Sequence, residues 1–133
     1  MAIPAPVGND ARRLACRWVL DPALAQALVN MDRFFADQFA AAGFRWPGVW
    51  ITSGYRSRAR QAQVNPDAPD SLHTRCPSLA VDVRVGSIPG ISGTQGGEQL
   101  LRMMGGYWKA QGYRWGGDFR NNYDPIHFDL GQF

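Results

Sequence analysis

The residues of this chain that could do chemistry are few, and its two histidines are the most informative of them. The 133 residues contain only His73 and His127. Asp82 follows His73 by nine residues and faces away from the valines that flank it in an alternating run. A catalytic zinc site needs three protein ligands from His, Asp or Glu and an open position for water. His73, Asp82 and His127 meet that count and are the candidate metal ligands.

Two other charged residues draw attention beside these three. Asp124 lies three residues before His127, close enough to reach water on a metal held by that histidine. A metal lowers the pKa of bound water from 15.7 toward about 7, and a nearby carboxylate can then accept the proton. Arg56 is the one arginine in the Ser53–Ser57 segment.

The spacing alone leaves other interpretations open. A lone histidine is more often a hydrogen-bonded structural residue, and an aspartate before a proline commonly begins a turn. The pattern is also not the HExxH helix of many metallopeptidases. Cys76, near His73, is a weaker candidate nucleophile, because the neighbouring Pro77 and the short loop favour an incidental thiol. We expect Cys76 and Cys16 to be free and at least half-buried, with a single disulfide as the alternative.

Composition excludes several classes of protein. A chain of 133 residues makes one domain, and 45% hydrophobic with 19% charged residues is not the composition of a disordered or fibrous protein. No apolar run is long enough to span a membrane. The net charge of +3 suits an anionic partner such as a cell-wall polymer, but the arginines are scattered, so we expect no nucleic-acid module. The first residues lack the features of a Sec-type signal peptide, so we expect synthesis in the cytoplasm.

The elements that must position these residues can be predicted from periodicity. Residues 1–20 are expected to be an extended or loosely helical lead-in. A helix is predicted after Asp21-Pro22, a typical cap and first residue, and it should end at Gly43. Its apolar stripe is expected to be a core face. The stripe consists of Leu24, Leu28, Met31, Phe35 and Phe39.

Short strands and a second helix complete the prediction. The helix is predicted over 98–111, with Leu101, Met104 and Trp108 on one face and Gly112 ending it. A helix-compatible stretch leads to Gln63, and loops are expected over 65–70 and 86–97. The strands are predicted at 49–52, 79–85, 113–115 and 127–130. This pattern indicates an α+β domain with a small, largely antiparallel sheet packed by helices.

Three segments, taken in order, resemble the motifs of one family. The segments are Ser53-Gly54-Tyr55-Arg56-Ser57-x-x-x-Gln61, then Ser71-x-His73 followed by Ala80-Val81-Asp82, then Trp115-Gly116-Gly117-Asp118-Phe119 followed by Asp124-x-x-His127-Phe128. They resemble the zinc peptidases that include D-alanyl-D-alanine carboxypeptidases, vancomycin-resistance D,D-dipeptidases and phage L-alanyl-D-glutamate endolysins. The resemblance runs from Trp50 to Leu130 and implies the zinc fold shared by hedgehog proteins and D-Ala-D-Ala peptidases.

The resemblance assigns roles to the candidate residues. It implies Zn²⁺ bound by His73, Asp82 and His127, with Asp124 as the acid/base. It implies that Arg56 steadies the substrate carbonyl as that oxygen gains negative charge. One departure is visible: the family usually has seven residues from His to Asp and a glycine where Ser78 stands, whereas the separation here is nine. We expect the two extra residues, within Thr74–Pro77, to bulge from the turn, since loops absorb insertions at little cost.

The implied function is zinc-dependent hydrolysis of a peptide bond in peptidoglycan stem peptides, by residues 1–133 as a single catalytic domain. A phage endolysin that reaches the wall through a holin-type pore is the expected setting, and the protein is expected to be a monomer. The alternatives are a non-catalytic virion- or wall-associated binding module that keeps the fold, and a papain-like Cys/His wall hydrolase. Ser71 is expected to support a ligand or to form a turn, Trp115 to line the cleft or the core, and Asp118 to cap a loop.

Overall fold

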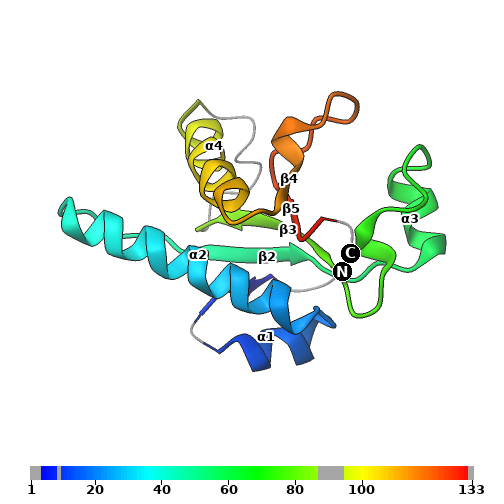
Figure 1. The fold of residues 1–133 in the computed structure, drawn as a ribbon, viewed down its shortest axis with the longest axis horizontal. Coiled ribbons are helices and arrows are strands. Elements are labelled where there is room, and N and C mark those ends of the chain that lie inside the picture. The colour runs from blue at the N-terminus through cyan, green and yellow to red at the C-terminus, as the bar shows by residue number, and fades with distance from the viewer. Residues whose placement is uncertain (1–3, 9, 87–94, 132–133) are drawn as a thin grey trace.

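A five-stranded sheet, with every pair of strands antiparallel, carries the fold (Figure 1). The computed structural model describes residues 4–8, 10–86 and 95–131. The strands stand in the order β1-β2-β3-β5-β4. The elements are β1 (Ala5–Pro6), α1 (Ala11–Trp18), α2 (Pro22–Ala41), β2 (Val49–Ser53), α3 (Arg58–Val64), β3 (Ala80–Val85), α4 (Gln95–Ala110), β4 (Arg114–Trp115) and β5 (His127–Asp129), with short 3₁₀ helices η1 (Leu72–Thr74) and η3 (Gly116–Asp118).

The long helix α2 forms as its sequence predicts. The Asp21 side chain accepts a hydrogen bond from the Ala23 amide, which would otherwise lack a partner at the start of the helix. Pro22, which has no backbone N–H, occupies the first turn. Leu24, Leu28 and Met31 are fully buried, as the predicted stripe requires. The helix ends at Ala41, and Gly43 follows with φ +82°, in the left-handed region that favours glycine.

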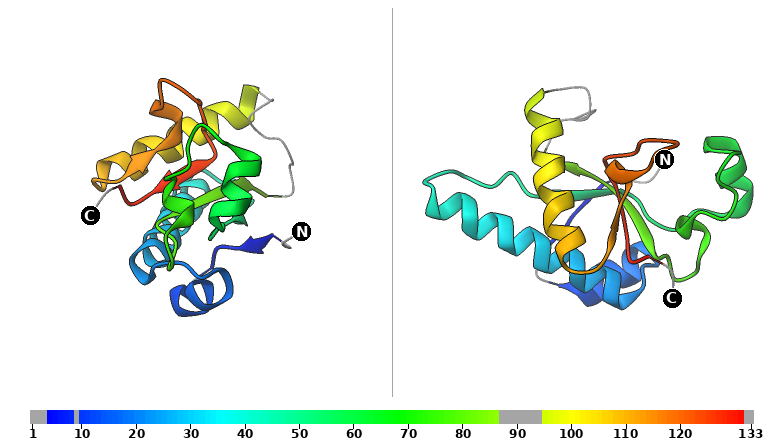
Figure 2. Two further views of the ribbon diagram at one scale, coloured as in Figure 1. Left: turned by 90° about the vertical axis from the view of Figure 1, so that its right-hand side faces the viewer. Right: turned by 45° about the horizontal axis from the view of Figure 1, so that its top comes forward.

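Helix α4 packs against both α2 and the sheet, and two adjacent glycines show how closely. Its predicted face, formed by Leu101, Met104 and Trp108, is fully buried. A Cβ on Gly105 would lie 2.2 Å from the Trp115 ring, whereas a Cβ on Gly106 would meet nothing within 4 Å. The helix can therefore approach β4 only because residue 105 has no side chain. Figure 2 shows α4 crossing α2 steeply.

The two faces of the sheet have different surroundings, and this difference creates the site. Val81, Val83 and Val85 point into the core that α1, α2 and α4 cover. Asp82 and Arg84, the alternate residues of the same strand, point to the other side and are half-buried. Helix α3 stands apart, at the opposite end of the molecule from the C-terminal end of α2 (Figure 1).

The structure sharpens one prediction and corrects another. Residues 11–18 form a regular helix and residues 5–6 a short edge strand, where the sequence predicted only a loose lead-in. Asp10 caps α1 by accepting from the Arg13 amide. The cysteines are free, as expected, but both are exposed, so the prediction of buried or half-buried thiols is wrong. Their positions, on a small exposed helix and in a bulged loop, leave the thiols without neighbours to cover them.

Two further outcomes concern the rest of the chain. Most of the loop predicted at 86–97 lies outside the described residues, and α4 begins at Gln95, three residues earlier than predicted. None of the helices in the described ranges is long and apolar enough to cross a membrane.

Candidate metal and catalytic site

The three candidate metal ligands come from neighbouring parts of the sheet. Asp82 on β3 and His127 on β5 stand directly opposite each other in the antiparallel register. Side chains at opposed positions share one face of the sheet, so both point to the side away from the valine core. His73 reaches the same point from η1. The planes of the His73 and His127 rings are inclined by 70°, and their centroids are 5.0 Å apart. The sheet register brings together residues that lie 45 positions apart in the chain.

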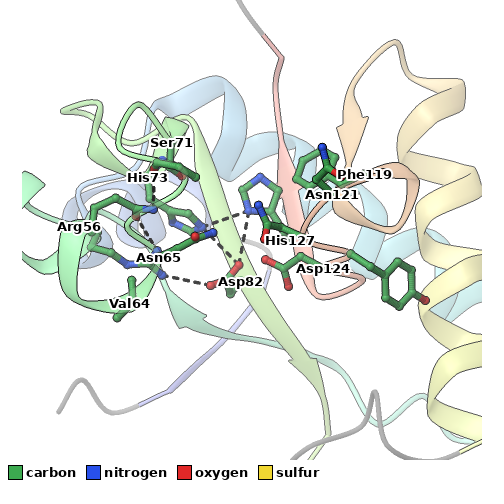
Figure 3. Close-up of a pocket in the computed structure, with 14 residues that line it drawn as sticks. Arg56, Val64, Asn65, Ser71, His73, Asp82, Phe119, Asn121, Asp124 and His127 are labelled. Atoms are coloured by element: carbon green, nitrogen blue, oxygen red, sulfur yellow. Dashed lines mark hydrogen bonds and ion pairs between the residues drawn. The ribbon is translucent and has the colours of Figure 1, made fainter.

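Three ligand atoms converge in this cluster (Figure 3). His73 Nε2 lies 3.2 Å from His127 Nδ1 and 3.3 Å from Asp82 Oδ1, and His127 Nδ1 lies 3.6 Å from Asp82 Oδ1. Ligands held at about 2.0–2.1 Å by a tetrahedral metal are about 3.3 Å from one another. Two imidazole nitrogens and a carboxylate oxygen are also the donors that zinc prefers. The observed spacing and chemistry therefore fit a zinc ion bound by these three residues.

The outward-facing nitrogens of both histidines have partners of their own. His73 Nδ1 lies 2.8 Å from the Gly54 carbonyl oxygen and donates to it. His127 Nε2 lies 2.7 Å from Asp129 Oδ2. Because carbonyls and ionised carboxylates only accept, these contacts place a proton on each outer nitrogen and direct the inner nitrogens of His73 and His127 toward Asp82.

Burial and charge shift the acid–base properties of the cluster. Burial alone would raise the pKa of Asp82, but hydrogen bonds with His127 and His73 outweigh it and hold that pKa well below its usual range. Burial alone would lower the pKa of His127, and its hydrogen bonds to Asp129 and Asp82 instead raise it to about 9. The cluster without a metal thus pairs a carboxylate with a cationic imidazole. Metal binding would release this proton, because an imidazole that ligates a metal must be neutral.

Arg56 lies in the wall of the site and is tightly held. Its Nη2 donates to Asp82 Oδ2 at 3.3 Å and to Ser53 Oγ at 3.1 Å, while Nη1 donates to Gln61 Oε1 at 2.8 Å. Its backbone amide also donates to the His73 carbonyl oxygen at 2.7 Å. The guanidinium, only 15% exposed, is therefore fixed beside a candidate metal ligand and remains in contact with the cavity.

Asp124 reaches the site from the opposite wall, on the segment before β5. Its amide donates to the Gly116 carbonyl oxygen at 3.0 Å, and its own carbonyl accepts from the His127 amide at 3.0 Å. A Cβ on Gly116 would lie 2.1 Å from the Asp124 carbonyl oxygen, so only glycine fits there. Burial and the negative charge of Asp82 raise the pKa of Asp124 above that of an ordinary carboxyl. Figure 3 shows its carboxylate pointing toward the cluster.

All five candidate residues line one cavity of about 540 Å³. One wall is α3 with the loop that follows it, and the other is the 119–124 segment, the two parts that rise on the right of Figure 1. Apart from the candidates, the lining is rich in amides and other polar groups. The remaining lining residues are Gln61, Val64, Asn65, Ala68, Ser71, Phe119, Asn121, Asn122 and Tyr123. Such a wall can hydrogen-bond the carbonyl, amide and carboxylate groups of a peptide.

The segment with the two inserted residues bulges outward, and the chain is buried again at Ser78. Residues 75–77 are exposed, whereas Ser78 is fully buried. The Ser78 amide donates to the Val19 carbonyl oxygen at 2.7 Å, and the Asp21 amide donates to the Ser78 carbonyl oxygen at 2.9 Å. Gly54, which holds His73, packs against Trp18 and Leu20 of the same α1–α2 junction. This junction therefore supports both the loop before Asp82 and the partner of His73.

The other candidates fall into structural roles. Ser71 lines the cavity, and its hydroxyl accepts from the His73 amide at 3.3 Å, so it forms the turn that presents the histidine. Trp115 is a core residue whose indole donates to the Pro125 carbonyl oxygen at 2.8 Å, which ties down the segment after Asp124. Asp118 is exposed and pairs with Lys109 at 2.9 Å. Cys76 is exposed and is not among the described residues that line the cavity.

Sequence reasoning missed the partners that hold the candidates in place. Gln61 appeared only as the end of a motif, yet it is 1% exposed and positions Arg56 while donating to the Ala68 carbonyl oxygen at 2.8 Å. Asp129 was not singled out at all, although it is fully buried against His127. A carboxylate in a buried strand, two residues after a candidate ligand and on the same face, is a signal that could have found it.

The chain resembles known proteins in sequence and in fold. The sequence model of a family described as D-alanyl-D-alanine carboxypeptidase matches residues 66–130. Among solved structures, the chain is similar to the L-Ala-D-Glu endopeptidase ChiX of Serratia marcescens, with a TM-score of 0.55 and 20% identity over 92% of this chain and 88% of that one. Curated protein sequences give no match. The matched segment contains His73, Asp82, Asp124 and His127, and the fold match extends over nearly the whole chain. Residues 66–130, just under half of the chain, are therefore similar to the D-alanyl-D-alanine carboxypeptidase family, and the fold is that of the endopeptidase structure.

Proposed function

We propose that this protein is a zinc-dependent peptidase that hydrolyses a peptide bond in peptidoglycan stem peptides. The observation that carries the proposal is the convergence of His73 Nε2, His127 Nδ1 and Asp82 Oδ1 at 3.2–3.6 Å, with an additional carboxylate and a guanidinium in the same cavity. The similarity of residues 66–130 to the carboxypeptidase family and the fold shared with an L-Ala-D-Glu endopeptidase support a peptidase that acts on the cell wall. The substrate bond is either of these two types, L-Ala-D-Glu or D-Ala-D-Ala.

The metal and the protein residues would contribute different chemistry. When bound by His73, Asp82 and His127, zinc supplies a Lewis acid that polarises a carbonyl and acidifies water. Asp124 is suited to accept the proton of the attacking water and to pass it to the leaving amine, because its raised pKa brings it closer to neutral pH. No other carboxylate among the described lining residues is free for this work, since Asp82 is held by Arg56 and both histidines.

Arg56 would act on the substrate oxygen that gains charge. Its guanidinium is fixed by Gln61 and Ser53 before any substrate arrives, so it needs no reorganisation during the reaction. Fixed donors that point at a developing oxyanion usually supply a large part of the rate enhancement in reactions of this type. A wall-degrading activity of this kind fits a phage lysis enzyme made in the cytoplasm and released to the wall through a holin-type pore, and we propose that role with it.

The test separates the enzyme from a binding module that keeps the same fold. Asp124→Asn preserves size and most hydrogen bonding but removes the proton acceptor. We expect this variant to bind zinc and wall fragments as the wild type does, and to release almost no peptide from peptidoglycan. Bound zinc, wall pull-down and peptide release should be measured on the same preparation.

The matched control is Asp118→Asn, which makes the same change at an exposed carboxylate paired with Lys109. It should leave peptide release at the wild-type rate. Unimpaired release by Asp124→Asn would mean that Asp124 only begins the turn before Pro125, a position that asparagine also suits. Zinc binding without release by the wild type would identify the protein as the binding module instead.

A further inference from the structure

Asp129 is a fully buried carboxylate that the proposed chemistry does not use. It is 0% exposed, and both of its oxygens are occupied. Oδ2 accepts from His127 Nε2 at 2.7 Å and from Arg114 Nη2 at 2.8 Å. Oδ1 accepts from the Gly131 amide at 2.8 Å and from Arg114 Nε at 3.1 Å. A buried charge with this many partners is costly to assemble, so its position calls for a specific role.

The sheet register creates the arrangement. Arg114 on β4 stands directly opposite Asp129 on β5, so the fork of the guanidinium meets the carboxylate across the strands. His127 lies two residues before Asp129 in the same strand, and therefore on the same face. The half-exposed guanidinium of Arg114 contacts the buried carboxylate of Asp129, and this carboxylate in turn contacts the imidazole of His127 in the candidate metal cluster.

We propose that Asp129, clamped by Arg114, is a positioning residue that fixes His127 with its Nδ1 toward His73 and Asp82 and so strengthens metal binding by this cluster. The inference rests on the proposed metal site. A neutral imidazole carries one N–H, and the carboxylate of Asp129 requires that proton on Nε2, which leaves the Nδ1 lone pair 3.2 Å from His73 Nε2. A carboxylate behind a ligating histidine also makes the ring a stronger electron donor.

The two histidines differ in this respect. His73 donates its outer N–H to a neutral acceptor, the Gly54 carbonyl oxygen. Only His127 has a charged partner on its outer nitrogen, and Arg114 holds that partner, Asp129. Arg114 also lies over the Phe119 ring, at 5.0 Å, and this ring is 5.3 Å from the His127 ring and lines the cavity. The clamp therefore restrains His127 from two sides, through Asp129 and through Phe119.

The test measures metal affinity directly, by competition between the protein and a chromogenic zinc chelator. Removal of an outer partner of a metal-bound histidine typically costs about 10- to 100-fold in metal affinity. We expect a loss in this range for Asp129→Ala, and a smaller loss for Asp129→Asn, whose neutral oxygen still accepts from Nε2–H. Arg114→Ala should weaken zinc binding in the same direction, by at least about threefold, because it frees Asp129 to rotate.

The control is Lys109→Ala. Like Arg114, Lys109 lies over an aromatic ring, here Trp115, and pairs with a carboxylate, here Asp118. No hydrogen bond or ion pair joins Asp118 to a histidine among the described residues. This variant should bind zinc with wild-type affinity. A proton NMR spectrum of the zinc-loaded protein adds a signature that a general loss of packing does not produce. The Nε2–H of His127 should give a slowly exchanging, downfield resonance that disappears in Asp129→Ala.

The outcomes distinguish this inference from the proposed function. If the wild type takes up no zinc, the metal site itself is wrong and the inference fails with it. If the wild type binds zinc and the folded Asp129 variants bind it equally well, only the inference fails. Should the Asp129 variants not fold, Arg114→Ala decides alone, since its side chain is 48% exposed. Wild-type zinc affinity in that variant would overturn the proposal.

Discussion

At the scale of single residues, the site is a network in which most charged groups contact another charged group. Asp82 contacts both histidines and Arg56, so one carboxylate links the candidate metal ligands to the candidate oxyanion donor. Asp124 differs from the other carboxyls of the site. Burial and the negative charge of Asp82 raise the pKa of Asp124, whereas the pKa values of Asp82 and Asp129 are lowered. Two carboxyls with pKa values displaced in opposite directions suit opposite roles, a fixed anion and a proton carrier.

Arg56→Ala tests the oxyanion role. The variant should keep its zinc and its fold, and peptide release should fall by about two orders of magnitude or more, as on loss of an oxyanion donor. Arg56→Lys should restore only part of the rate, because one ammonium cannot reach Asp82, Ser53 and Gln61 together. Steady-state kinetics on purified peptidoglycan fragments, with zinc content measured in parallel, provide the check. Wild-type kinetics in the alanine variant would reduce Arg56 to a structural partner of Asp82.

The candidate residues were predictable from the sequence, and most of their supports were not. His73, Asp82, Asp124, His127 and Arg56 are chemically distinctive, occur in a recognisable order, and line one cavity in the structure. Their supports depend on which strands pair and in what register. Arg114 meets Asp129, for example, only because β4 and β5 are adjacent in the sheet. Local periodicity carries no information on such pairings.

At the scale of elements, local rules account for the helices and strands, and close packing accounts for the exceptions. The capped start and apolar stripe of α2 suffice to predict it, and the alternating valines predict β3. Helix α1 was underestimated because prolines and a glycine precede it and only Leu14 is buried within it. The double glycine in α4 is unfavourable for a helix by local propensity, and the structure shows a tertiary reason for one of the two glycines, the contact between Gly105 and Trp115.

The two glycines of α4 should respond oppositely to the same change. Gly106→Ala should raise the free energy of unfolding by about 0.5–1 kcal/mol, because alanine is the better helix former and its Cβ meets nothing within 4 Å. Gly105→Ala should lower it by about 1–3 kcal/mol, because the new Cβ overlaps the Trp115 ring. Urea denaturation of both variants provides the measurement. Equal effects at the two positions would contradict the packing of α4 on β4.

Asp32 of α2 offers a test of how the helix is joined to β2. Its Oδ1 accepts from the Trp46 indole at 2.8 Å and from the Val49 amide at 3.0 Å, and burial raises its pKa in spite of these bonds. Asp32→Asn keeps the acceptor and removes the charge, so it should be at least as stable as the wild type at pH 7. Asp32→Ala should lower the free energy of unfolding by about 1–3 kcal/mol, because the Trp46 indole and the Val49 amide both lose their acceptor.

The pH dependence of the Asp32 comparison has a definite sign. A carboxyl with a raised folded-state pKa stabilises the fold below its unfolded pKa, and this contribution is lost as pH rises through the folded pKa. The stability advantage of Asp32→Asn over the wild type should therefore shrink as the pH falls from 7 toward the acidic range. Unfolding titrations at several pH values measure this difference. An advantage that grows toward acidic pH would contradict the raised pKa.

At the scale of the whole molecule, the site depends on parts of the chain that the family match does not include. The match begins at residue 66, whereas Arg56 lies before it, as does the α1–α2 junction that supports Gly54 and Ser78. The fold match to ChiX covers 92% of the chain, so these segments belong to the same architecture. The N-terminal helices thus act as a base for the cluster, and the exposed 75–77 bulge adds length without entering the cavity.

The most direct measurement is mass spectrometry of purified peptidoglycan after digestion by the wild-type protein. The account predicts new peptide termini within the stem peptide, at L-Ala-D-Glu or D-Ala-D-Ala bonds. A zinc chelator should abolish their release and added zinc should restore it. Alkylation of the two exposed cysteines should leave it unchanged, because the account gives no role to a thiol. An intact stem peptide after digestion by zinc-loaded protein, or cleavage that survives the chelator but not alkylation, would contradict the account.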